Sequence, residues 1–181
     1  LYSSAASDVY KRQHLDYARD MFLFSFYTRG MSFIDMAYLK KSDLKNGIIT
    51  YRRRKTGQQL TVKWEKCMED IIAKYGENTA TRYLLPIITN PCSDERPQYR
   101  NAICRINVAL KEVAGLAGLN IPLTMHVARH CWASVAKSKN IPLSVISEGM
   151  GHDSEETTRI YLASLDTSVV DKANSLILKD F

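Results

Sequence analysis

Apolar side chains recur every three to four positions over most of the chain, which is the spacing typical of amphipathic α-helices. The stretch DYARDMFLFSFYTRG is strongly apolar, and Gly30 interrupts it before MSFIDMAYL continues with the same period. Thr124 stands as an N-cap before one later helix, and Gly76 closes another. The pattern predicts helices over residues 15–29, 31–39, 65–76, 98–118, 124–137, 142–146, 154–164 and 167–181.

One segment has a different pattern. Residues 48–64 alternate apolar and polar positions and are rich in β-branched side chains, which favours two strands around a turn at Lys55-Thr56-Gly57-Gln58. The preceding KKSDLKNG is a polar turn, and residues 84–97 are mostly extended or loop. We therefore expect a mainly α fold with one small antiparallel β-hairpin, of the α+β class.

The first thirteen residues, LYSSAASDVYKRQ, are small and polar and show neither a helical nor a strand period. We interpret residues 1–13 as a flexible leader or as sequence foreign to the domain. The remainder, 14–181, is long enough to bury a real core and is predicted to form one domain.

The charge adds a first indication of a partner. The 181 residues carry a formal net charge of +6 and a sequence pI near 9.1, which favours a polyanion and nucleic acid first. The chain has no apolar run as long as a membrane span and no evident signal peptide, so no membrane partner is expected. Four scattered cysteines without a CxxC pair are typical of reduced thiols in a cytoplasmic protein. They are Cys67, Cys92, Cys104 and Cys131.

The segment TMHVARHCWASVAK places unusual chemistry on an apolar helix. His126 and Arg129 are three residues apart and share a face, while His130 lies about 100° around the axis from Arg129. His126 and His130 also have the spacing of paired zinc ligands, but Val127 stands where the zincin motif requires Glu. We therefore predict no metal site.

A second cluster lies in GMGHDSEETTRIYLA. Gly151-His152 form a tight turn, an acidic and capped first turn follows, and Tyr161 lies nine residues after His152. Each residue alone has a structural interpretation, as a turn or a core tyrosine. The fixed spacing of His-x-x-Arg-His, Gly-His and Thr-Thr-x-x-Tyr is harder to explain in that way.

With these motifs the sequence resembles the tyrosine site-specific recombinases, the integrases of phages and conjugative elements. The resemblance extends over residues 15–181 and implies the catalytic-domain fold of that family. Met150 replaces the family's usual Leu before Gly-His, which is a mild change. The positions that match are His126, Arg129, His130, Gly151, His152, Thr157, Thr158 and Tyr161.

The resemblance implies an enzyme that cuts and rejoins DNA strands through a 3′-phosphotyrosyl intermediate at Tyr161. Arg129 would then offset the charge on the phosphorane, because a guanidinium fits the non-bridging oxygens. His126 is the expected base for the phenol, and His152 a donor to the phosphate. The reaction needs no cofactor, neither ATP nor a divalent metal.

The predicted hairpin also has a counterpart in the family, whose members place a lysine on a β-hairpin beside the active site. Lys55 in RRRKTGQQ occupies the corresponding place and suits the acid that protonates the leaving 5′-oxygen. The alternative is a solvated basic turn that binds phosphate backbone. The residues predicted to contact DNA are Arg52, Arg53, Arg54 and Lys63.

One position departs from the family pattern. In the first arginine box, GMSFID aligns Ser32 with the arginine that grips the scissile phosphate. Arg29 precedes it by three residues and would reach the same place if the helix continued through Gly30. The alternative is that one arginine of 52–54 supplies the charge.

The expected partner is double-stranded DNA, with a monomer when free and a tetramer on DNA during synapsis. Full family members carry an N-terminal clamp domain that is not present here, so we interpret the chain as a catalytic-domain fragment. The apolar stripe of residues 169–178 packs either into a neighbouring protomer or on its own core. The competing hypotheses are a DNA-binding module without catalysis, a topoisomerase-like nicking enzyme and a zinc-dependent hydrolase.

Overall fold

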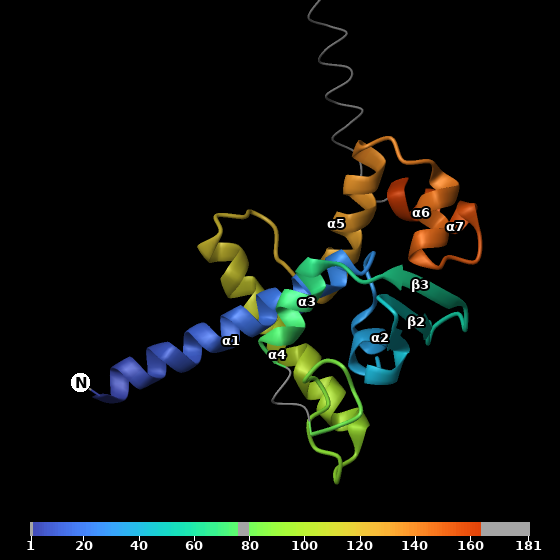
Figure 1. Ribbon diagram of the computed structural model, residues 1–181. Helices are drawn as coiled ribbons and strands as arrows, with labels where there is room; N and C mark the ends of the chain where they lie inside the picture. The colour runs from blue at the N-terminus through green and yellow to red at the C-terminus, as the bar shows by residue number, and fades with distance from the viewer. Residues whose placement is uncertain (1, 76–79, 164–181) are drawn as a thin grey trace, which may run out of the picture.

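The computed structural model describes residues 2–75 and 80–163 of the chain. This part contains seven α-helices and a three-stranded antiparallel sheet at one side of them, so the predicted mainly α class with a small sheet is confirmed (Figure 1). The helices are α1 (Tyr2–Tyr27), α2 (Phe33–Ala37), α3 (Lys66–Ala73), α4 (Glu95–Leu116), α5 (Met125–Ser138), α6 (Leu143–Met150) and α7 (Glu155–Ala163). The strands are β1 (Leu44–Lys45), β2 (Ile48–Arg52) and β3 (Gln59–Lys63), and a short 3₁₀ helix, η1 (Lys41–Asp43), precedes them.

The sheet has the order β1-β2-β3, and the pairing of β2 with β3 runs from Ile48 opposite Lys63 to Arg52 opposite Gln59. Alternate side chains of these two strands are buried, which the period-two pattern predicted. Strand β1 was missed, because KKSDLKNG is mostly polar and only two residues pair. Asn46 and Gly47 both have positive φ and form the tight turn that brings β1 against β2.

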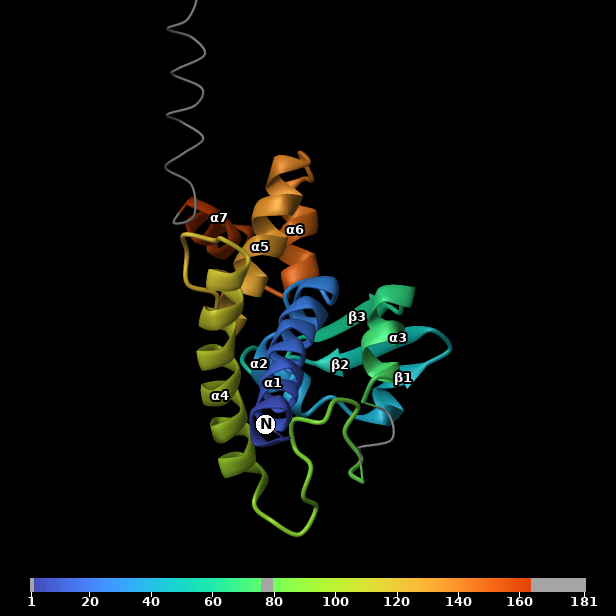
Figure 2. The ribbon, with the colours of Figure 1, turned by 90° about the vertical axis from the view of Figure 1, so that its left-hand side faces the viewer.

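Helix α1 is the centre of the fold. Its buried face carries Ala18, Met21 and Phe24, all fully buried. Figure 2 shows α4 on one side of α1 and the sheet with α3 on the other. The main core cluster therefore lies where α1, α4 and the inner face of the sheet meet.

The start of α1 differs from the sequence prediction. Residues 2–13, predicted as a flexible leader, are helical and continue α1 without a break. They contain neither Gly nor Pro, so a helix nucleated by the packed residues after 14 propagates through them. That they are foreign to the domain stays a prediction.

The interruption predicted at Gly30 is confirmed, so the helix does not continue through it toward Ser32. Arg29 and Gly30 both lie in the left-handed region, with φ of 61° and 73°, and the chain turns between α1 and α2. Ser25 Oγ donates to the carbonyl of Met31 at 2.7 Å and secures this turn. Ser32 then caps α2, accepting from the backbone N–H of Asp35 at 3.4 Å. Arg29 is therefore not one helical turn before Ser32.

A smaller core cluster joins α5, α6 and α7 through Ala133, Ala136, Ile146, Met150 and Leu162. Helices α6 and α7 therefore form one unit that docks on α5 (Figure 1). The site described below lies where this unit meets the hairpin and the end of α1.

Some helix bounds also differ from the prediction. Helix α4 begins three residues early, because Asp94 caps it and Pro97 is tolerated within its first turn. Helix α6 continues beyond Ile146 to Met150 and ends at Gly151, whose φ is 64°. The closing Gly76 and the terminal helix 167–181 with its stripe 169–178 lie outside the described residues.

Across the described residues, no helix combines the length and the apolar character that a membrane span requires.

Candidate active site

Arg129 lies at the centre of the site and is almost fully buried on α5, with 6% of its surface exposed. Its Nη1 donates to the carbonyl of Gly30 at 2.8 Å, and its Nη2 donates to the carbonyl of Met150 at 2.6 Å. The same Nη2 lies 3.0 Å from Nε2 of His152. The end of α1 and the end of α6 therefore hold one guanidinium between them.

The turn at residue 30 lies so close to Arg129 that only glycine fits there. A Cβ at Gly30 would lie 2.7 Å from Cγ and 2.8 Å from Cα of Arg129. The positive φ of Gly30 also disfavours any residue with a side chain. The turn after α1 can approach α5 this closely only with glycine at this position.

The hairpin brings a second guanidinium to the same place. Arg53, in the turn between β2 and β3, is 7% exposed, and its Nη1 donates to the carbonyl of Gly151. A Cβ at Gly151 would lie 2.8 Å from Cδ1 of Leu60, so the end of α6 packs directly on β3. Residues about 100 positions apart thus form one contact, and Arg53 enters the site beside Arg129.

The charge of this pair is not balanced by salt bridges in the part of the chain that the structure describes. Burial lowers the pKa of Arg129 to about 10, and the nearby charge of Arg53 acts in the same direction. Even so, Arg129 is protonated at neutral pH. Two buried cations side by side are a site that favours an anion.

His152 has a defined tautomer. Because a guanidinium only donates, Nε2 of His152 accepts from Arg129, and Nδ1 carries the proton toward Thr158 Oγ1 at 2.7 Å. Burial lowers the pKa of His152 to about 4, with Arg129 and Arg53 as further causes. His152 is therefore neutral at pH 7 and faces the arginines as an acceptor.

Tyr161, on α7, lies among three imidazole rings. The ring of His130 is parallel to it, with an interplanar angle of 8° and centroids 4.8 Å apart. The rings of His152 and His126 meet it edge-on, with centroids at 5.7 Å and 6.5 Å. Burial raises the pKa of Tyr161 to about 12, and the charge of Arg129 acts in the opposite direction.

The other two imidazoles are also kept neutral. Burial lowers the pKa of His126, and Arg129 and Lys55 lower it further. Burial likewise lowers the pKa of His130, together with His126 and Arg129. In the described residues, no group of three or more His, Cys, Asp or Glu side chains is placed to hold a metal ion.

The structure brings Lys55 to the rim of this site. It lies in the exposed turn of the hairpin, and its charge acts on both His126 and His152. Of the predicted catalytic set, Tyr161, Arg129, His126 and His152 are gathered within contact of one another. The role of Lys55 in the reaction stays a prediction.

Arg29 has a different environment. It is half-buried, and its Cδ lies 3.6 Å from the point where a Cβ of Gly149 would stand. This atom therefore lies near α6 and Trp132, which contacts the same point at 3.0 Å. The charge of Arg29 also acts on Tyr51, as the charges of Arg129 and Arg53 do. Its role in the reaction stays a prediction.

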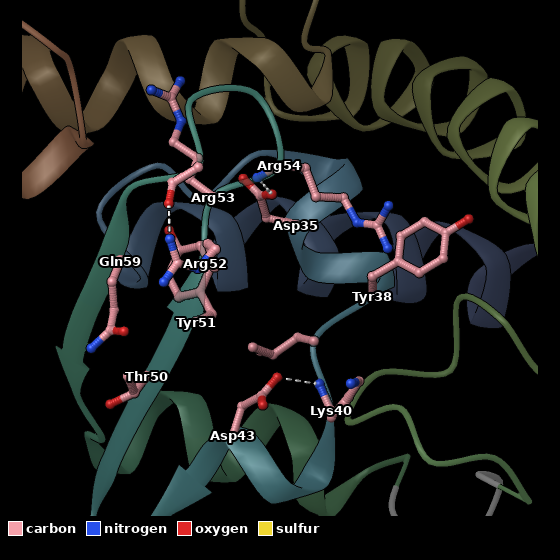
Figure 3. Close-up of a pocket in the computed structure, with 12 residues that line it drawn as sticks. Asp35, Tyr38, Lys40, Asp43, Thr50, Tyr51, Arg52, Arg53, Arg54 and Gln59 are labelled. Atoms are coloured by element: carbon pink, nitrogen blue, oxygen red, sulfur yellow. Dashed lines mark hydrogen bonds between the residues drawn. The ribbon is translucent and has the colours of Figure 1, made fainter.

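Of the remaining predicted DNA contacts, Arg52 and Arg54 line an open pocket of about 470 Å³ beside the hairpin, which Arg53 also lines (Figure 3). Arg54 stacks over the ring of Tyr38, with its Cζ 3.6 Å from the centroid, and Arg52 donates to the carbonyl of Gly57 at 2.8 Å. Lys63 lies at the far end of β3 and pairs with Glu65 at 3.4 Å.

Sequence reasoning missed the residues that tie the hairpin to α2. Asp35 is 5% exposed; its Oδ1 accepts from the backbone N–H of Arg54 at 2.8 Å, and its Oδ2 accepts from Ser32 Oγ at 2.6 Å. The Ser-x-x-Asp spacing at the start of a helix is a capping signal and could have indicated the Ser32–Asp35 contact. Nothing local in the sequence indicates the contact with Arg54.

Comparison with known proteins relates the chain to a protein family. The model of the phage integrase family, the tyrosine recombinases, matches residues 6–168. No curated protein matches the chain.

The chain is similar in fold to several solved recombinase structures. XerA recombinase has 20% identity and a TM-score of 0.58, over 89% of this chain and 62% of that one. XerH recombinase in a post-cleavage complex with palindromic difH substrate has 19% identity and a TM-score of 0.60, over 91% and 50%. A lambda integrase dimer bound to a COC′ core site has 15% identity and a TM-score of 0.58, over 84% and 56%. This chain thus spans about half to three fifths of the length of these structures.

Proposed function

Since the chain belongs to the phage integrase family, we propose that it cleaves and rejoins duplex DNA in site-specific recombination, with Tyr161 as the nucleophile. The observation that carries this proposal is the convergence of two buried guanidiniums and a tyrosine. Arg129 and Arg53 come from different elements, and salt bridges within the described residues do not neutralise them. The charge of Arg129 acts on the phenol of Tyr161, which neutral imidazoles border. A phosphodiester is the anion that suits this set.

In the first step the Tyr161 oxygen attacks the phosphorus, the new O–P bond forms, and the bond from phosphorus to the 5′-oxygen breaks. The 3′ end remains attached as a phosphotyrosine, which keeps the bond energy for rejoining. Reversal with the 5′-hydroxyl of a second strand exchanges the strands. The charge that develops on the non-bridging oxygens is offset by Arg129 and Arg53.

The phenol needs help to lose its proton, because burial raises the pKa of Tyr161 to about 12. His126 is neutral at pH 7 and edge-on to the phenol ring, and we assign it the role of proton acceptor. His152 accepts from Arg129 in the free protein. It donates to the phosphate only after its ring has taken up a proton.

Arg53 takes the place of the arginine that Ser32 replaces. It is buried, it contacts the backbone of Gly151 next to His152, and its charge reaches Arg129. Arg29 is only half-buried, and its Cδ lies near Gly149, although its charge also acts on Tyr51. Of the alternatives that the sequence left open, the geometry favours Arg53.

Lys55 is the acid for the leaving group. A chemical substitution tests this role directly: sulfur in place of the bridging 5′-oxygen leaves as a thiolate and needs no proton from the protein. We expect Lys55→Ala to lose adduct formation on ordinary DNA and to regain it on the sulfur-substituted duplex. Loss on both substrates would assign Lys55 to DNA binding instead.

The partner is double-stranded DNA, and the protein acts as a tetramer on two duplexes and is a monomer when free. The basic hairpin and the net charge of +6 support the DNA partner. The XerH and lambda integrase structures, which share the fold, contain those proteins bound to DNA sites. Size measurement with and without two-site DNA tests the assembly, because a topoisomerase-like nicking enzyme would not pair two sites.

The central experiment captures the covalent adduct from DNA of random sequence, so that no target site has to be chosen. The protein is incubated at low salt with a pool of duplexes of randomised core sequence that carry bridging 5′-sulfur, and the denatured adducts are isolated and sequenced. We expect adducts with the wild type and none with Tyr161→Phe at equal DNA binding. Normal binding without any wild-type adduct would replace this proposal by the DNA-binding module without catalysis.

A further inference from the structure

His130 has a contact that the reaction described above does not use. Its ring lies parallel to the ring of Tyr161, with an interplanar angle of 8° and centroids 4.8 Å apart, whereas the other two imidazoles meet the phenol edge-on. His126 in turn meets the ring of His130 at 88°, with centroids 4.4 Å apart. One face of the nucleophile's ring therefore lies against His130.

The contact with the face of the phenol restricts rotation of the Tyr161 side chain about its Cα–Cβ bond. Leu162, 4% exposed, fixes α7 in the cluster with Ala133 and Ala136 of α5. Packing of Leu162 positions the backbone of Tyr161, and the phenol itself packs against the same cluster, so its orientation depends on the rings around it as well as on its Cα–Cβ rotamer. A flat ring stacked on the phenol restricts that rotation, since parallel rings lose contact as soon as one of them tilts.

His130 is not placed to exchange a proton with the phenol. The lone pairs and N–H bonds of an imidazole lie in its ring plane, so in a parallel stack they point past the phenol and not toward its oxygen. Its Nδ1 is buried and has no hydrogen-bond partner within the described residues. Burial also lowers the pKa of His130, so the ring is neutral when it stacks.

We propose that His130 is a positioning residue, which orients the Tyr161 phenol toward the scissile phosphate by ring stacking and takes no part in proton transfer. The proposal rests on the function proposed above for Tyr161. It differs from a metal-ligand role, since it requires only a flat ring at residue 130. Phenylalanine therefore substitutes for histidine, and alanine does not.

The orientation is tested without DNA. With 3-fluorotyrosine at position 161, the ¹⁹F spectrum of the full chain reports the neighbouring ring through its ring-current shift. We expect a shifted resonance in the wild type and in His130→Phe, and a resonance moved toward the free amino acid in His130→Ala. An unchanged resonance in His130→Ala would overturn the proposal, whatever the protein does to DNA.

The consequence for the reaction is tested on the captured duplex, at saturating DNA. We expect His130→Ala to form the adduct ~10- to 100-fold more slowly, as for a misplaced reacting group, with unchanged DNA affinity. His130→Phe should recover the rate to within about threefold and keep the wild-type pH profile. A slow His130→Phe with an intact fluorine shift would overturn the proposal and assign His130 a chemical role.

Different results would contradict the role of Tyr161 as nucleophile and the role of His130 in orienting it. If the wild type forms no adduct, the function proposed for Tyr161 falls, while the fluorine spectra still decide whether His130 orients the phenol. If His130→Ala does not fold, as measured by urea unfolding, the His130→Phe variant decides alone, because the proposal requires it to keep both the shift and the rate.

Discussion

Two structural requirements apply at residue 30, and glycine is the residue type that meets both. Its carbonyl accepts from Arg129 at 2.8 Å, and the space where a Cβ would stand is already occupied by the Arg129 side chain and backbone. Its backbone also has φ of 73°, which costs a residue with a side chain roughly 1 kcal/mol. The position of the central guanidinium thus depends on a residue without chemistry of its own.

We predict that Gly30→Ala lowers the free energy of unfolding by about 2–4 kcal/mol, because backbone strain and overpacking add. Gly47→Ala is the matched control, since Gly47 has φ of 72° but nothing within 4 Å of the place that a Cβ would take. It should lose only about 1 kcal/mol. Urea unfolding of both variants gives the comparison, and equal losses would contradict the packing argument.

The low pKa of His152 predicts how the stability of the folded protein depends on pH. Its value in the folded protein is about 4, below the ordinary value near 6.5, so below pH 6.5 the unfolded chain binds a proton that the folded protein does not. Stability should therefore fall as the pH drops from about 6.5 toward 4 and should be flat just above that range. His126 and His130 act in the same direction.

The measurement is the urea midpoint of wild type and His152→Gln between about pH 7 and pH 5. Glutamine does not titrate, so the advantage of the wild type over the variant should shrink as the pH falls. Contributions from carboxylates and from the other histidines are common to both proteins. A difference that stays constant with pH would show that His152 is not held neutral by its surroundings.

At the scale of elements, the site depends on how α2 holds the hairpin. Asp35 joins the two, since its carboxylate accepts from Ser32 on one side and from the backbone N–H of Arg54 on the other. Arg54 is flanked by Arg53 and Lys55, the two residues that we assign to the phosphate and the leaving group. The bond therefore fixes the turn at the point where it matters for the reaction.

We predict that Asp35→Ala loosens this turn while the rest of the sheet stays paired. Hydrogen exchange at the amide of Arg54 should become at least about tenfold faster, because the amide loses its acceptor. Asp43→Ala is the control, since Asp43 accepts from the exposed backbone N–H of Lys40 at 2.8 Å. It should leave exchange at Arg54 unchanged. Equal protection of the Arg54 amide in both variants would refute the role of Asp35 in holding the turn.

At the scale of the whole molecule, the positive charge is distributed unequally. Arg52 and Arg54 line the open pocket beside the hairpin, together with Arg53 (Figure 3). Lys66, by contrast, pairs with Asp70 at 2.9 Å and with Glu69 at 3.4 Å. A polyanion is therefore expected to follow the hairpin side of the molecule and not α3.

We predict that DNA affinity falls steeply with salt and that Arg54→Gln reduces the slope of log K against log salt by about 1. Lys66→Gln should leave the slope unchanged, because its charge is already neutralised locally. Fluorescence anisotropy with a labelled duplex over a salt series gives both slopes. The same slope for Arg54→Gln and the wild type would exclude a phosphate contact at this residue.

Most of the elements followed from the sequence because helical and strand periods are local properties. The helices from 98 to 164 and the hairpin were predicted close to their observed positions, and the motifs around Arg129 and Tyr161 indicated the family that the comparison shows. Errors occurred where a signal was weak or absent, as in the two-residue strand β1 and the helical residues 2–13.

The sequence by itself determined which residue types stand on which helix and in what order, because those depend on neighbours three or four positions away. Only the tertiary structure placed Arg53 close to Arg129. This placement depends on the turn at Arg29 and Gly30 and on the packing of Gly151 against Leu60, contacts between segments far apart in the chain. The stacking of His130 on Tyr161 is of the same kind, since two rings from different helices become parallel only when α7 has docked on α5.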